Sequence, residues 1–143
     1  MTMAMSIEER EAFLADLHVG VMSIERADGP PLAVPVWYDY QPGEELWLIT
    51  DGSTLKAKLL AQAGRFSLCA QTEDPPYSYV SVEGACRIEP SDAEEHRRPM
   101  ARRYLGPEGG DWYVDNVAEG PDPIVVYMRP QRWFTVDYGK ADR

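Results

Sequence analysis

LAVPVWYDYQPGEELWLITDGSTLKAKLLAQAG, residues 32–64, is the stretch that decides the fold. It predicts a strand, a turn, a second strand and a helix, over residues 32–40, 41–44, 45–50 and 53–63 respectively. Both strand segments are rich in β-branched and aromatic residues. The helical segment has its leucines on one stripe, and Gly64 follows as a C-terminal stop. The spacing of the apolar residues therefore changes at Asp51 and Gly52 from that of a strand to that of a helix.

The sequence on both sides of this stretch supplies more strands than helices. Ser6–Glu9 is a capping box that opens an amphipathic helix ending before Gly20. The further strand-like runs are residues 18–26, 65–71, 77–88, 124–128 and 132–138. Ser91–Glu94 caps a helix through about Tyr104, residues 106–111 break it, and residues 112–118 add one or two helical turns. The first three strands are expected to form an antiparallel meander.

Six or seven strands with interposed helices and no regular βαβ alternation indicate a mainly β protein. The expected architecture is a six- to seven-stranded antiparallel β-barrel with peripheral helices. A chain of 143 residues fits a single domain, residues 1–143, and its apolar share of 44% suffices for a core.

Charge and cysteine content exclude several function classes. The net charge of −10 argues against nucleic acid or an anionic membrane as the main partner. No apolar run approaches 18 residues, and residues 1–14 lack the pattern of a signal peptide. Cys69 and Cys86 are the only cysteines and have no histidine cluster nearby, so we expect neither a disulfide scaffold nor a metal site. A cytoplasmic location is expected.

The segment TDGSTLKAK, residues 50–58, has the chemistry of a phosphate site. It runs from a strand end through a glycine turn into a helix N-terminus, which offers unpaired N–H groups and a positive dipole end. Ser53 and Thr54 can add hydroxyl donors, and Lys56 and Lys58 can add ammonium groups. The same residues also fit a plain helix cap, made by Asp51 or Ser53, with solvated lysines.

The second feature is Val34-Pro35-Val36-Trp37 in the predicted second strand. Proline cannot donate to a strand ladder, so it belongs at an edge or bulge. Backbone exposed there could meet the polar edge of a flat ring system, with Trp37 close by. The alternative is an edge strand that proline protects from aggregation.

Taken together, these motifs resemble the pyridoxamine 5′-phosphate oxidase-like split-barrel superfamily, and most closely its deazaflavin-dependent branch. The motifs are VPVWYD, LWLIT, DGSTLKAKLL, GRFSLCAQ and YSYVSVEGACRIEP, and they cover residues 7–89. The resemblance implies an FMN-binding-type split barrel. It also implies that the cofactor is coenzyme F420, with FMN as the alternative.

The resemblance assigns roles residue by residue. Thr50, Ser53 and Lys56 stand where the family contacts the cofactor phosphate, and Lys58 is a supporting basic position. Val34, Pro35, Val36 and Trp37 stand where the second strand lines the ring system. In the family, each site is completed across a homodimer interface. Aromatic side chains of one subunit could therefore cover the cofactor of its partner; the candidates are Trp112, Trp133 and Tyr138.

The function that the resemblance implies is hydride transfer from a reduced deazaflavin to a conjugated small molecule. The alternatives are an FMN-dependent oxidoreductase and a non-catalytic flavin- or deazaflavin-binding protein. The C-terminal run RWFTV, residues 132–136, lacks the ending of true pyridoxamine phosphate oxidases, so that activity is not expected. No catalytic side chain is assigned. The basic run His96–Arg103 fits either a groove for the acidic tail of F420 or a solvated helix face.

Overall fold

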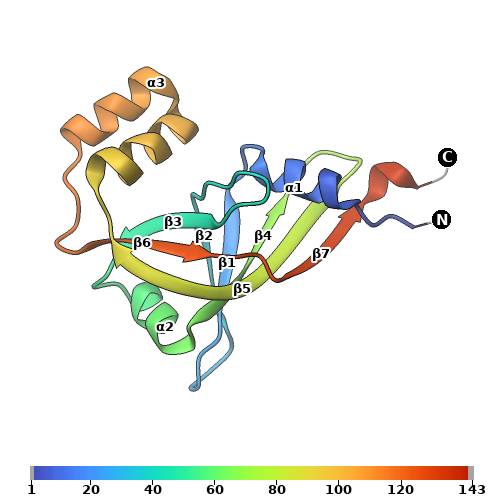
Figure 1. Cartoon of the computed structure of the whole chain (residues 1–143), viewed down its shortest axis with the longest axis horizontal. Helices are drawn as coiled ribbons and strands as arrows, with labels where there is room; N and C mark the ends of the chain where they lie inside the picture. Colours follow the sequence, from blue (N-terminus) through green and yellow to red (C-terminus); the bar gives the residue numbers. More distant parts are fainter. Residues whose placement is uncertain (1, 142–143) are drawn as a thin grey trace.

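Seven antiparallel strands form one curled sheet in the computed structural model, which describes residues 2–141 (Figure 1). The strands are β1 (Gly20–Ile24), β2 (Leu32–Val36), β3 (Leu46–Asp51), β4 (Arg65–Gln71), β5 (Ser78–Pro90), β6 (Pro123–Met128) and β7 (Arg132–Asp137). Their order is β2-β1-β4-β5-β6-β3, and β7 pairs with β5 beside this path. The predicted mainly β barrel with peripheral helices is confirmed, and β2 with its Pro35 lies at a sheet edge.

The long strand β5 holds the two parts of the sheet together. Its first part lies between β4 and β7, and its last five residues pair with β6 instead. The change of partner occurs near Gly84, where a Cβ atom would lie 2.1 Å from the Arg129 carbonyl oxygen. Glycine is therefore required for the close approach of the two backbones.

The first three strands do not form the predicted meander. β1 pairs with β2, but β3 pairs with β6 on the far side of the sheet. The second strand ends at Val36 rather than residue 40, because the chain then turns Tyr38 and Tyr40 into the core. An isolated bridge between Asp39 and Trp47 links this segment to β3. That bridge brings the two edges of the curled sheet together.

Three α-helices lie outside the sheet among residues 2–141; the first has the expected N-terminal cap and the second the expected C-terminal stop. Ser6 and Glu9 form the predicted capping box of α1 (Ile7–Ala15). Thr54, rather than Asp51 or Ser53, caps α2 (Leu55–Ala63), and Gly64 ends it in the left-handed conformation at φ 67°. None of the helices among residues 2–141 is both long and apolar enough to cross a membrane.

The helical region after β5 differs from the prediction. Asp92, not Ser91, caps it, and the first turn is a π-helix, η1 (Ala93–Arg97). α3 (Arg98–Asn116) follows and is broken only at Gly106, whose φ is 80°. Helical structure resumes at Pro107, since proline is favoured at the first position of a helix. The result is a helical hairpin that stands off one side of the sheet (Figure 1).

Replacing Gly84 tests the close approach at the centre of β5. Gly84→Ala places a methyl group against the Arg129 carbonyl, so we expect a loss of about 1–3 kcal/mol in the free energy of unfolding. Gly29→Ala is the matched control, because its nearest neighbour would be 3.7 Å away at the Arg26 side chain. Urea denaturation measures both, and equal stabilities for the two variants would contradict the packing argument.

Candidate functional site

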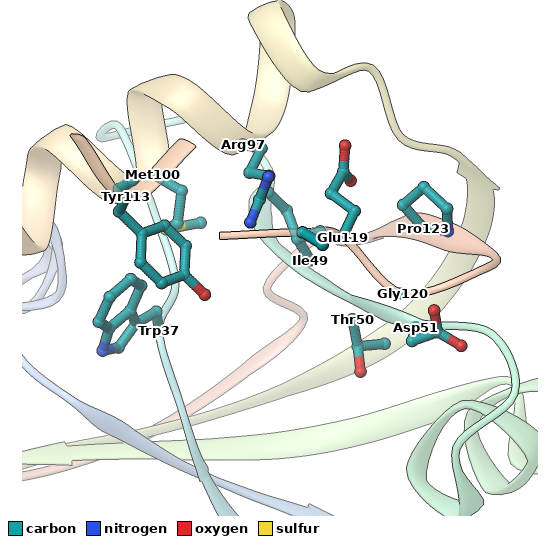
Figure 2. Close-up of a pocket in the computed structure, with 12 residues that line it drawn as sticks. Trp37, Ile49, Thr50, Asp51, Arg97, Met100, Tyr113, Glu119, Gly120 and Pro123 are labelled. Carbon is teal, nitrogen blue, oxygen red and sulfur yellow. The ribbon is translucent and has the colours of Figure 1, made fainter. Parts of the chain in front are cut away.

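A pocket of about 210 Å³ lies between the helical hairpin and the ends of β2 and β3 (Figure 2). Its lining combines aromatic and apolar side chains with three charged ones: Trp37, Ile49, Thr50, Asp51, Arg97, Met100, Ala101, Tyr113, Ala118, Glu119, Gly120 and Pro123. An apolar cavity of roughly 150 Å³ accepts benzene, so this pocket has room for a substituted aromatic ring.

Trp37 forms one wall of the pocket and is held by Tyr104 of α3. The two rings stack with centroids 4.7 Å apart and planes only 3° from parallel. Tyr104 in turn donates its hydroxyl hydrogen to the His18 carbonyl at 2.5 Å and accepts from the Tyr38 N–H at 3.0 Å. Burial raises the pKa of the Tyr104 hydroxyl, so it stays neutral and keeps its hydrogen. Trp37 is thus fixed by its stacking on Tyr104.

The opposite wall is built from two loops fastened to each other. The Asp51 carboxylate accepts the Asp122 N–H at 3.0 Å, and the Gly52 N–H donates to the Asp122 carbonyl at 2.7 Å. A Cβ atom at Gly52 or Gly120 would lie 2.1 or 2.0 Å from a carboxylate oxygen of the opposite loop. The Ser53 hydroxyl and the Asp122 N–H lower the pKa of Asp51. This wall therefore depends on an ionised Asp51 and on two glycines.

Arg97 is the only cation that lines the pocket among residues 2–141. One of its guanidinium nitrogens donates to the Val117 carbonyl at 2.7 Å, and its Cζ atom lies 5.1 Å from the centre of the Tyr113 ring. The described part of the chain gives Arg97 no carboxylate partner, although Asp51 and Glu119 line the same pocket. It therefore keeps donors that a ligand can use.

The N-terminus of α2 lies directly after β3 and forms a second, smaller feature. The Thr54 hydroxyl accepts the Ala57 N–H at 3.2 Å, so the cap uses one of the first-turn donors. The N–H groups of Leu55 and Lys56 have no acceptor within residues 2–141. Lys56 is half-buried, and burial lowers the pKa of its ammonium group. The same part of the chain supplies no carboxylate for it.

The structure brings only part of the predicted site together in the pocket. Trp37 and Thr50 line it. Val36 is buried in the core, Val34 packs against that core, and Pro35 is exposed at the sheet edge. The other predicted residues lie on or before α2, outside the pocket lining: Ser53, Lys56 and Lys58.

The side chains of the predicted phosphate segment differ in their surroundings. The Ser53 hydroxyl donates to Asp51, so the serine already has an acceptor within its own turn. Lys58 is exposed, whereas Lys56 is half-buried. Within residues 50–58, Lys56 and the two open N–H groups beside it are therefore the best-placed hydrogen-bond donors for an anion.

Sequence reasoning missed the contribution of the helical hairpin to the pocket. Arg97, Met100 and Tyr113 come from η1 and α3, 47 to 63 residues after Thr50 in the chain. The basic run His96–Arg103 was the only available signal, because it contains Arg97. Nothing in the local pattern marks Tyr113 as a pocket residue.

Most of the basic run is used inside the hairpin. Arg98 and Arg102 pair with carboxylates of the same helical region: Glu94, Asp111 and Asp115. Arg103 donates to the carbonyls of Tyr38, Ala15 and Asp16. These arginines stabilise the hairpin and its contact with the barrel, which leaves Arg97 as the member of the run that faces a pocket.

Comparisons with known proteins agree with this architecture. A conserved hypothetical protein from Mycobacterium tuberculosis is 24% identical with a TM-score of 0.75, covering 99% of this chain and 92% of its own. An F420 reductase is 23% identical with a TM-score of 0.62, covering 87% and 94%. A FAD-binding protein from Mesorhizobium loti is 20% identical with a TM-score of 0.67, covering 91% and 93%. At these identities the similarity shows the fold alone.

A search of curated protein sequences finds no match. The sequence profile of the family described as pyridoxamine 5′-phosphate oxidase, in contrast, matches residues 6–137, from the cap of α1 to the end of β7. The resemblance first seen in residues 7–89 thus extends over nearly the whole chain and agrees with the antiparallel split barrel. The chain belongs to the pyridoxamine 5′-phosphate oxidase family.

Proposed function

We propose that this protein is a cytoplasmic F420-dependent reductase that transfers a hydride to a conjugated small molecule. The observation that carries the proposal is Lys56: a half-buried ammonium group without a carboxylate partner in residues 2–141, beside open helix N–H groups. Partial burial of an unpaired cation is unfavourable unless an anion completes the site. An F420 reductase among the proteins of similar fold supports the choice of cofactor.

The donor set fits the phosphate of a flavin or deazaflavin. Lys56 would hold it together with the N–H groups of the first turn of α2, where the helix dipole also favours negative charge. Thr50, the residue before the last of β3, lines the pocket, and Lys58 adds positive charge from an exposed position. The Ser53 hydroxyl can donate to the phosphate only if it gives up its hydrogen bond to the Asp51 carboxylate.

The ring side of the proposed site follows the edge strand β2. Val34, Pro35 and Val36 are the residues of this strand proposed to line the ring system, and Trp37 follows them at the pocket. When bound, the reduced cofactor supplies two electrons as a hydride. The protein contributes binding, orientation and a pocket beside Trp37 for the second molecule.

FMN is the second candidate cofactor, because it shares the ribityl phosphate that Lys56 would bind. The FAD-binding protein of similar fold supports this alternative. A non-catalytic cofactor-binding protein is the third candidate. The pocket under α3 favours an enzyme over a carrier, since it leaves room for a ring-sized second molecule.

We further propose that the protein is a homodimer with the cofactor at the subunit interface. The outer face of the sheet has a row of small and apolar side chains crossing five adjacent strands: Pro35, Val21, Cys69, Ser81 and Phe134. Val21 is 44% exposed and Phe134 is 64% exposed. An apolar sheet face of this kind is typical of an interaction surface. A second copy that covers it is the proposed partner.

Removing the Lys56 ammonium group tests the cofactor site. Lys56→Ala should weaken F420 binding by roughly 10- to 100-fold, because a hydrogen bond to a charged group is worth about 1.5–3 kcal/mol. Lys58→Ala should have a smaller effect, since that side chain is exposed. Fluorescence-quenching titrations with F420 and separately with FMN measure both. A wild-type preference for FMN would replace the cofactor assignment, and binding of neither would overturn the proposed function.

A charge on the outer sheet face tests the dimer. Val21→Glu should shift the protein from dimer to monomer in sedimentation velocity and weaken cofactor binding in parallel. Leu105→Glu on α3 is the matched control, because Leu105 is also 44% exposed but lies away from that face. A wild-type protein that sediments as a monomer at micromolar concentration would refute the dimer proposal.

A further inference from the structure

The pocket under α3 contains two hydrogen-bond donors that the proposed cofactor site does not use. Arg97 has one nitrogen on the Val117 carbonyl and its guanidinium against the Tyr113 ring. Its other N–H groups have no acceptor within residues 2–141. The Tyr113 hydroxyl likewise has no hydrogen-bond partner in the described chain. Figure 2 shows both groups directed toward the interior of the pocket, and the Glu119 carboxylate directed away from Thr50.

Arg97 is held in this position by an unusual backbone. It ends the π-helical turn η1, and short π segments occur frequently at functional sites. The turn is anchored by His96, whose Nδ1 accepts the Asp92 N–H at 2.9 Å and whose Nε2 lies 2.9 Å from the Tyr127 hydroxyl. The guanidinium is therefore preorganised rather than a freely moving surface group.

Trp37 supplies the complementary surface for a flat ligand. One face of its ring is stacked on Tyr104, and the Tyr113 ring adjoins it at a centroid distance of 6.2 Å and a tilt of 54°. A planar ring against Trp37 would have Arg97 and Tyr113 at its edge. Asp51 and Glu119 line the same pocket, so a carboxylate on the ligand would meet like charge.

We propose that Arg97 and Tyr113 are specificity-determining residues that donate hydrogen bonds to a carbonyl oxygen of a neutral, planar, conjugated substrate. Two donors on one acceptor oxygen fix the ring orientation in the pocket, and Arg97 strengthens the interaction because its donor group is charged. That this site holds the substrate of a reductase rests on the proposed function. That it binds a carbonyl compound depends only on Arg97, Tyr113 and Trp37.

Three ring compounds of similar size separate the possible kinds of recognition. Acetophenone carries a neutral carbonyl, ethylbenzene carries no oxygen, and benzoate carries a negative charge. We expect the wild-type protein without cofactor to bind acetophenone most tightly, measured as dissociation constants by ligand-observed NMR titration. Equal binding of all three probes, or preference for benzoate, would overturn the proposal.

Arg97→Met removes the charged donor while keeping an unbranched side chain of moderate length. It should weaken acetophenone binding by about tenfold, equivalent to about 1.4 kcal/mol, and leave ethylbenzene binding unchanged. Tyr113→Phe should have a smaller effect in the same direction. Arg129→Met, at an arginine outside the pocket lining, is the control for loss of charge. If Arg97→Met lowers the binding of acetophenone and ethylbenzene equally, Arg97 only shapes the pocket and the proposal fails.

The cofactor titration distinguishes this proposal from the proposed function. F420 binding should be within twofold of wild type in Arg97→Met, whose site is separate from Lys56. If the wild-type protein fails to bind F420 but still prefers acetophenone in an Arg97-dependent way, the reductase function is refuted and the carbonyl site stands. If it binds F420 without that preference, the carbonyl site alone is refuted.

Discussion

The backbone pair between Asp39 and Trp47 is the contact on which the arrangement of the site depends. Its two hydrogen bonds, 2.9 and 3.0 Å long, join the segment after the edge strand β2 to the strand β3 at the other end of the sheet order. Because the pair brings these edges together, Trp37 and Thr50 line one pocket although they belong to opposite ends of the sheet. Without this pair, the predicted motifs at residues 34–37 and 50–58 would lie at opposite edges of the sheet.

The segment from Thr50 to Lys56 connects the two features of the candidate site. Its first residues line the pocket under α3, and its last residues form the first turn of α2. The contacts between Asp51, Gly52 and Asp122 hold this segment against the loop after α3. The same segment would therefore contact both a cofactor phosphate near Lys56 and a ring-sized molecule in the pocket beside Trp37.

Some basic side chains of this acidic chain stabilise the fold, and others are available to bind a ligand. Arg98, Arg102 and Arg103 form ion pairs or bind backbone carbonyls, and these contacts hold the hairpin together and against the barrel. Arg97 and Lys56 lack carboxylate partners within residues 2–141. Both side chains lie beside the candidate site, where Lys56 can bind an anion and Arg97 can donate hydrogen bonds to a polar ligand.

The sequence alone determined the strand and helix content, because apolar periodicity, caps and turn residues are local properties. The capping box at Ser6 and Glu9, the stop at Gly64 and the edge position of Pro35 all followed from residue chemistry. The family resemblance was also visible in the motifs of residues 7–89. Only the tertiary structure decided that β3 pairs with β6, since strand pairing depends on contacts between distant segments. It likewise placed Arg97 and Tyr113 beside Trp37, because no local pattern encodes which residues of a hairpin 60 to 76 positions away will face a pocket.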